Sequence, residues 1–204
     1  MKSPITGSRM AAILLFLLAL DAILYYQAII LDKSYIYDEF QLIENLQAFT
    51  LLIAFSIFAA TLFVAKRGER AVVAAGALLW LTMFLREVDF EELHVTGVIA
   101  FLTVGKSKDA ILAVVWLFLL GYLAKHFSRY KPLLQSLIFS KMGLVVFVGG
   151  LSLLAGDFFE KVHFPHHDFY EETLELDGYL LILFGSLFFP AVLRGIDTER
   201  NLQR

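Results

Sequence analysis

Several apolar runs, each close to twenty residues long, follow one another along this chain. The hydrocarbon core of a bilayer is about 30 Å thick, and a helix crosses it in about twenty residues. The composition agrees, because 59% of the 204 residues are hydrophobic and only 18% are charged, too few to wet a soluble domain of this size. The runs are continuous, whereas membrane β-strands alternate. The sequence therefore predicts an all-α integral membrane protein.

The apolar runs predict a single transmembrane domain, a bundle of six transmembrane helices. Their approximate limits are 10–31, 42–64, 71–88, 110–128, 133–159 and 173–193. The first run follows basic residues, as in a signal peptide, but its length and the lack of a small-x-small cleavage site indicate an uncleaved helix. Residues 95–104 are apolar but too short to span, so we expect them to lie in the interface or to re-enter the membrane.

The basic residues divide unequally between the two sides that six spans define. Eleven lie on the side of the termini and five on the opposite side, with Lys141 inside a span. The positive-inside rule then predicts cytoplasmic termini and outward acidic loops, in a plasma membrane such as the bacterial inner membrane. The larger group is Lys2, Arg9, Lys66, Arg67, Arg70, Lys125, Arg129, Lys131, Arg194, Arg200 and Arg204, and the smaller is Lys33, Arg86, Lys106, Lys108 and Lys161.

Acids and histidines gather at the outward ends of four predicted helices, near residues 44, 86–94, 157–163 and 171–175. Two of these ends contain Glu-x-x-His, at Glu91–His94 and Glu160–His163. Residues three apart on a helix share a face, so each pair can bind one cation. With a glutamate from each of two other helices, the set resembles that of di-iron carboxylate bundles, although the usual alternation of helices is not kept.

The predicted site combines these residues at the outward face. Imidazole and carboxylate ligands suit a divalent metal such as iron or zinc, and the chain has no cysteine to supply a thiolate. We expect Arg86 to organise carboxylates by pairing with Glu87, Asp89 or acids of the sixth helix. The candidate metal ligands are Glu44, Glu87, Glu91, His94, Glu160, His163, His167 and Glu175, and the candidate catalytic residues are Arg86, Asp89 and Glu172.

His163 and His167 also form His-x-x-x-His. This spacing resembles that of the CREST class of membrane hydrolases, which bind zinc through His, Asp and Ser. The seven spans expected of that class are not found among the apolar runs of this chain.

Other interpretations of the acids stay open. They can be solvated helix ends, since Asp168 and Glu171 have capping-box spacing and acids in a first turn complement the helix dipole. Against this, Glu171 and Glu175 are like charges one turn apart, a destabilising arrangement that a cation or a shared proton would relieve. The predicted function is a metalloprotein, with a hydrophobic or lipid-borne substrate if it is an enzyme. The alternatives are a proton- or cation-coupled carrier and a structural subunit without chemistry.

Asp21 lies about eleven residues into the first apolar run, close to the middle of the bilayer, where a carboxylate is costly unless it is paired. Lys141 falls at a similar predicted depth of roughly 14–16 Å in the fifth run. A buried Asp21–Lys141 pair is therefore one hypothesis. The alternatives are a protonated Asp21 bonded to Ser or Tyr, and a Lys141 that snorkels to the surface. The expected partner is the lipid bilayer, and no basic face suits nucleic acid.

Overall fold

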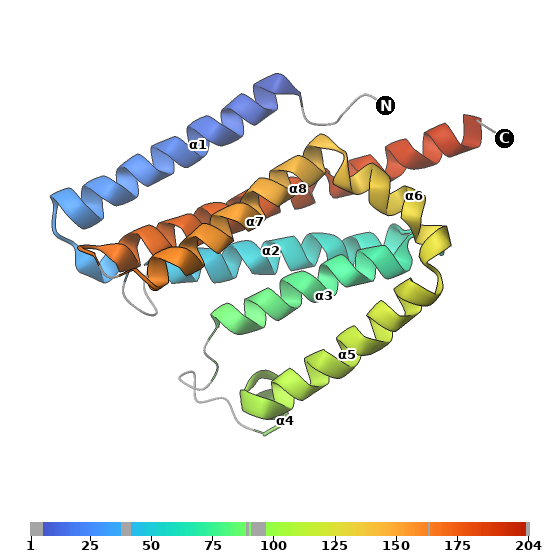
Figure 1. Ribbon diagram of the computed structural model, residues 1–204, viewed down its shortest axis with the longest axis horizontal. Helices are drawn as coiled ribbons and strands as arrows, with labels where there is room; N and C mark the ends of the chain where they lie inside the picture. Colours follow the sequence, from blue (N-terminus) through green and yellow to red (C-terminus); the bar gives the residue numbers. More distant parts are fainter. Residues whose placement is uncertain (1–5, 38–41, 89, 91–96, 163, 203–204) are drawn as a thin grey trace. The chain divides into compact units, whose positions relative to one another are not determined.

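The computed structural model describes residues 6–37, 42–88, 90, 97–162 and 164–202, and this part of the chain is all-helical, without strands. The long helices are α1 (Gly7–Tyr25), α2 (Leu42–Val64), α3 (Arg70–Glu87), α5 (Gly105–Lys125), α7 (Lys141–Glu160) and α8 (His167–Leu202) (Figure 1). The shorter ones are the π-helical turn η1 (Tyr26–Ile30), the 3-10 turn η2 (Ser34–Ile36), α4 (Gly97–Thr103) and α6 (Phe127–Ile138).

Five of the described helices are long and apolar enough to cross a membrane: Gly7–Ile30, Leu42–Val64, Gly105–Lys125, Lys141–Glu160 and His167–Arg194. These correspond to five of the six predicted spans. The remaining one, α3, has charged residues at both ends, Arg70 at its start and Arg86 with Glu87 at its end. Its apolar part, residues 71–85, is about 22 Å long, which is less than the roughly 30 Å of a hydrocarbon core.

The predicted fifth span, 133–159, is interrupted between α6 and α7. Ser140 ends the continuous run because it is the N-cap of α7, where its Oγ accepts a hydrogen bond from the Gly143 amide at 3.0 Å. Such a cap satisfies one of the amides that a helix start leaves without an intrahelical partner. Lys141 is therefore the first residue of α7, not a residue nine positions into a span. Pro132 lies inside α6.

Two further boundaries differ from the sequence-based expectation. α8 begins at His167, before the predicted limit of 173, so Asp168 lies within its first turn. The expected capping box of Asp168 and Glu171 is wrong for this reason, since an N-cap residue precedes the helix. The apolar segment predicted at 95–104 contains α4, a helix of seven residues.

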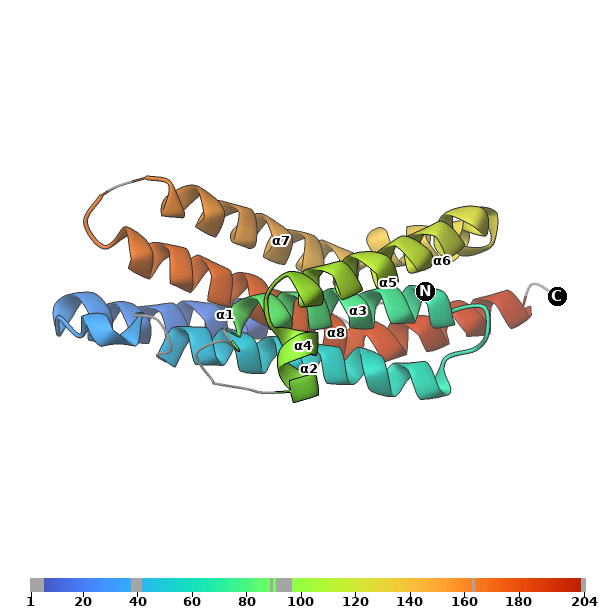
Figure 2. The ribbon, with the colours of Figure 1, turned by 90° about the horizontal axis from the view of Figure 1, so that it is seen from below.

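The helices divide into two compact units, and the first comprises Met1–Thr50 and Ser136–Arg204. Its main feature is the antiparallel hairpin of α7 and α8 (Figure 2). A Cβ atom built on Gly149 would lie 2.8 Å from the carbonyl oxygen of Gly178, and one on Gly178 would lie 2.9 Å from that of Gly149. The absence of side chains at both positions lets the two backbones approach, as between membrane helices generally.

A core of apolar residues joins α1, η1, η2 and the start of α2 to α8 in the same unit. The buried members are Leu24, Ala28, Ile36, Ile43, Phe169 and Leu176. They come from segments more than a hundred residues apart in the sequence, so this core packs the N-terminal elements against α8.

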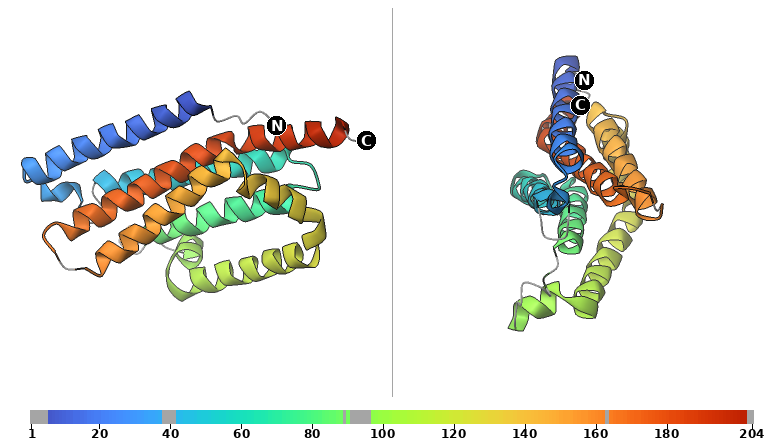
Figure 3. Two further views of the ribbon diagram at one scale, coloured as in Figure 1. Left: turned by 45° about the horizontal axis from the view of Figure 1, so that its top comes forward. Right: turned by 90° about the vertical axis from the view of Figure 1, so that its left-hand side faces the viewer.

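The second unit, Leu51–Gln135, contains the rest of α2 with α3, α4 and α5. Gly76 of α3 packs so closely on the Phe58 ring of α2 that any Cβ there would overlap it. Trp116 Nε1 of α5 donates a hydrogen bond to Thr82 Oγ1 of α3 at 3.1 Å, so this indole ties two helices together. α4 folds against the beginning of α5 (Figure 3).

Candidate metal centre

The turn between α7 and α8 brings the acidic ends of both helices to one end of the hairpin. Three rings pack around it, with centroid distances of 5.6 Å for Phe159–Phe164, 5.7 Å for Phe164–Tyr170 and 6.2 Å for Phe159–Tyr170. His166 has a φ of 61°, a left-handed conformation that costs a residue with a Cβ about 1–2 kcal/mol. The surrounding packing therefore has to hold the turn in this conformation.

His167, Asp168 and Glu171 form a compact group in the first turns of α8. One ligand atom from each lies within 4.8 Å of the others, and Nδ1 of His167 is 2.8 Å from Oδ1 of Asp168. Two ligands on opposite sides of one zinc ion would be up to about 4.4 Å apart, given metal–ligand distances of about 2.0–2.2 Å. Small side-chain rotations are therefore enough to bring all three onto one cation.

The charges around Glu171 favour a cation. Its carboxylate interacts electrostatically with Glu160 and Asp157 of α7 and with Asp168 and His167 of α8, and three of these four are acids. Two like charges about 4 Å apart repel by about 1 kcal/mol in bulk water and about 4 kcal/mol at a protein surface. The positive end of the α8 dipole opposes a cation by only about 0.3–1 kcal/mol. The carboxylates therefore outweigh the helix dipole.

The group is open to solvent on one side. The side chain of Asp168 is 62% exposed, whereas that of His167 is 28% exposed. An ion held here would keep a side accessible to water or to another ligand.

Glu172, a predicted catalytic residue, accepts hydrogen bonds from α2. Gln47, near the start of α2, is fully buried, and its Nε2 donates hydrogen bonds to the Glu172 side chain at 2.8 Å and to the Glu172 carbonyl at 3.0 Å. The Gln47 amide therefore joins the start of the second predicted span to the start of the last one. Glu44 lies in the first turn of α2 and is half-buried.

Glu175, a predicted metal ligand, lies inside the hairpin interface. It is only 9% exposed, and its Cγ would be 2.9 Å from a Cβ atom placed on Gly156 of α7. Glu175 is one turn beyond Glu171, so it lies deeper along α8 than the open group.

Arg86 and Glu87 form an ion pair at the end of α3, in the second unit. Nη2 and Nε of Arg86 each lie 2.9 Å from Oε1 of Glu87, which confirms one of the pairings expected for this arginine. The other predicted ligands and catalytic residues of this kind, Asp89, Glu91, His94 and His163, lie outside the described residues.

Asp21 has a different neighbour from the one predicted. Its carboxyl group interacts electrostatically with that of Asp177 of α8. Lys141 is exposed at the start of α7, and the described residues contain no Asp21–Lys141 ion pair. The depth match that suggested the pair fails because α7 begins at Lys141.

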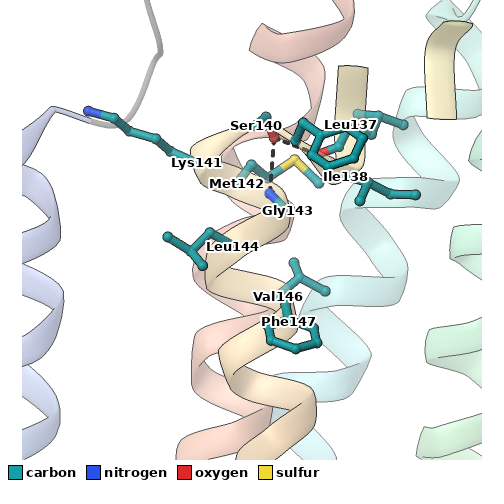
Figure 4. Close-up of a pocket in the computed structure, with 10 residues that line it drawn as sticks. Leu137, Ile138, Ser140, Lys141, Met142, Gly143, Leu144, Val146 and Phe147 are labelled. Carbon is teal, nitrogen blue, oxygen red and sulfur yellow. Dashed lines mark hydrogen bonds between the residues drawn. The ribbon is translucent and has the colours of Figure 1, made fainter. Parts of the chain in front are cut away.

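An apolar cavity of about 650 Å³ lies at the start of α7, away from the acids (Figure 4). It is lined by residues between Leu137 and Phe147, all except Val145, and Lys141 extends away from the apolar side chains. Nineteen residues, or about 28 Å of helix, separate Lys141 from Glu160. The cavity therefore lies at the end of α7 opposite to the acidic turn.

Comparison with protein-family models, curated proteins and solved structures finds no match to this chain. The functional argument therefore depends on side-chain geometry. Sequence reasoning missed Asp168 and Asp177 as site residues. The available signals were the His167, Asp168, Glu171 spacing, which is i, i+1, i+4 on one helix, and an acid inside an apolar run at 177.

Proposed function

We propose that this chain is a multi-pass membrane protein that binds a divalent metal, iron or zinc, where α7 meets α8. His167, Asp168 and Glu171 are its ligands, and Glu160 of α7 completes the acidic surroundings. The observation that carries this proposal is the approach of three ligand atoms to within 4.8 Å of one another, next to further carboxylates.

The donor set suits a catalytic rather than a closed structural site. Three protein ligands leave one position open in a tetrahedral zinc site, and such an ion supplies a Lewis acid for hydrolysis. In this role the three ligands would hold the ion, while Asp157 and Glu160, which interact electrostatically with Glu171, would accept or return a proton. A site at the end of a membrane hairpin suits a hydrophobic or lipid-borne substrate.

We also propose the orientation that places this site outward in a bacterial inner membrane. α3 is then a sixth crossing, and both termini are cytoplasmic. Its support is the unequal distribution of basic residues, eleven on the side of the termini against five on the other. The short apolar part of α3 can be accommodated if Arg86 snorkels to the interface.

The test is the metal content of the full-length protein purified in detergent, loaded with zinc or iron and desalted. The wild type should retain one ion per chain, and His167→Asn and Glu171→Gln should each weaken binding at least tenfold. His126→Asn is the matched control, because this half-buried histidine lies in the second unit beside Tyr122. A wild type without metal, or a Glu171→Gln variant that binds equally well, would show that the acids are only solvated helix ends.

A further inference from the structure

α1 and α8 lie side by side in antiparallel orientation within the first unit. Ring contacts mark the alignment, with centroids 6.3 Å apart for Tyr25–Phe169 and 5.9 Å apart for Phe16–Phe184. Further along, the Arg9 guanidinium lies 5.7 Å from the centre of the Phe188 ring. Residue numbers fall along α1 as they rise along α8, so residues near 21 and near 177 are at the same level.

At that level, two carboxyl groups meet. The carboxyl groups of Asp21 and Asp177 interact electrostatically with each other. Oδ1 of each is shielded from solvent and has no hydrogen-bond partner among the described groups. An ionised carboxylate only accepts hydrogen bonds, so the two groups can bond to each other only when one of them carries a proton.

Both groups lie deep in their spans. Asp21 is nine residues from Ile30 and Asp177 is ten residues from His167, the ends that Tyr25 and Phe169 bring together. These separations correspond to about 14 and 15 Å, roughly half of a 30 Å hydrocarbon core. One carboxylate at this depth already costs several kcal/mol, and a second beside it would add repulsion of about 4 kcal/mol at 4 Å.

No cation offsets the pair among the described groups that pack around it. Among the described groups, the ionisable group that acts on Asp21 is Asp177, and the one that acts on Asp177 is Asp21. On α1, Arg9 is twelve residues away and stacks on Phe188. On α8, Glu175 turns toward Gly156 of α7.

The charged groups of the remaining elements also have other neighbours. On α7, Asp157 and Glu160 act on Glu171, while Lys141 lies at the far end of the helix. At the start of α2, the charged group is Glu44, which is half-buried, and the buried Gln47 bonds to Glu172.

We propose that Asp21 and Asp177 share one proton and form a proton-binding site inside the membrane, separate from the metal centre. Thr173 is one turn before Asp177 on α8, and its buried hydroxyl has no hydrogen-bond partner among the described groups. Along α8, Thr173 lies between Glu171 at the hairpin end and Asp177. Such a site is what a carrier coupled to proton movement requires.

Infrared spectroscopy of the full-length protein in nanodiscs tests the proposal. A protonated carboxyl gives a C=O stretch above the amide I band, and the wild type should show one such group per chain at neutral pH. Asp21→Asn and Asp177→Asn should each lose it, because the amide that replaces one carboxyl can donate to the remaining carboxylate. Asp109→Asn, at an exposed position in the second unit, should keep the band.

A second measurement needs no variant, so it holds even if the asparagine proteins fail to fold. Wild-type protein labelled with ¹³C-aspartate should show the band shifted to lower frequency. The proposal is overturned if the wild type lacks the band, if the band survives in both asparagine variants, or if it does not shift on labelling.

Discussion

The contact between Gly149 and Gly178 makes a quantitative prediction about the α7–α8 hairpin. A Cβ atom on Gly178 would lie 2.7 Å from Cδ2 of Leu153 and 2.9 Å from the Gly149 carbonyl oxygen. Carbon atoms pack best at about 3.5–4.0 Å, so the Gly178→Ala overlap with Leu153 is about 0.8 Å. The leucine can rotate, but the carbonyl belongs to the backbone, so the helices must separate.

Gly150 provides the matched control, because it is on the same hairpin and a Cβ atom there meets nothing within 4 Å. Both alanine substitutions gain about 1 kcal/mol of helix propensity, which cancels in the comparison. We expect Gly178→Ala to be about 1–3 kcal/mol less stable than Gly150→Ala, the usual range for overpacking. Unfolding in mixed micelles titrated with SDS, followed by circular dichroism, measures the difference. Equal stability, or a more stable Gly178→Ala, would refute the close approach of the two backbones.

Two further predictions concern pH and topology. Burial raises the pKa of Tyr130, so the unfolded chain loses this proton first and stability should fall as the pH rises above the ordinary tyrosine value of about 10. Over that range, Tyr130→Phe should lose less free energy of unfolding than the wild type. Tyr35 is exposed, so Tyr35→Phe should behave as the wild type. An equal loss of unfolding free energy in Tyr130→Phe and the wild type at alkaline pH would contradict this prediction. The chain has no cysteine, so a single Lys66→Cys should react only with reagent on the cytoplasmic side and Lys161→Cys only with reagent outside. Labelling of both from one side would rule out the proposed orientation.

Hydropathy predicts most of the helices because crossing a bilayer requires length and apolarity, and both are local properties. It does not detect Ser140, because a cap acts through one hydrogen bond to the Gly143 amide and leaves the average hydropathy unchanged. It gives α3 a weaker signal than the other spans, since Arg70 and Arg86 flank a shorter apolar stretch. Errors therefore occur where a single polar group decides where a helix begins or ends.

For the candidate site, too, the sequence predicts what depends on local properties and not what depends on packing. The acids at the ends of α7 and α8 could be assigned to one region, because a short turn forces neighbouring helix ends together. The partner of Asp21 could not, because it depends on which nonadjacent helix packs against α1 and on the rotation of both helices. These are set by side-chain contacts such as Tyr25–Phe169, which span most of the chain.

The central claim is that imidazole and carboxylate groups at the start of α8 bind one metal ion. X-ray absorption at the zinc edge of the loaded, full-length protein tests it most directly. We predict one imidazole nitrogen and carboxylate oxygens at about 2.0–2.2 Å, with the imidazole signal lost in His167→Asn and kept in His126→Asn. A spectrum with oxygen ligands alone, or one unchanged in His167→Asn, would contradict the assignment.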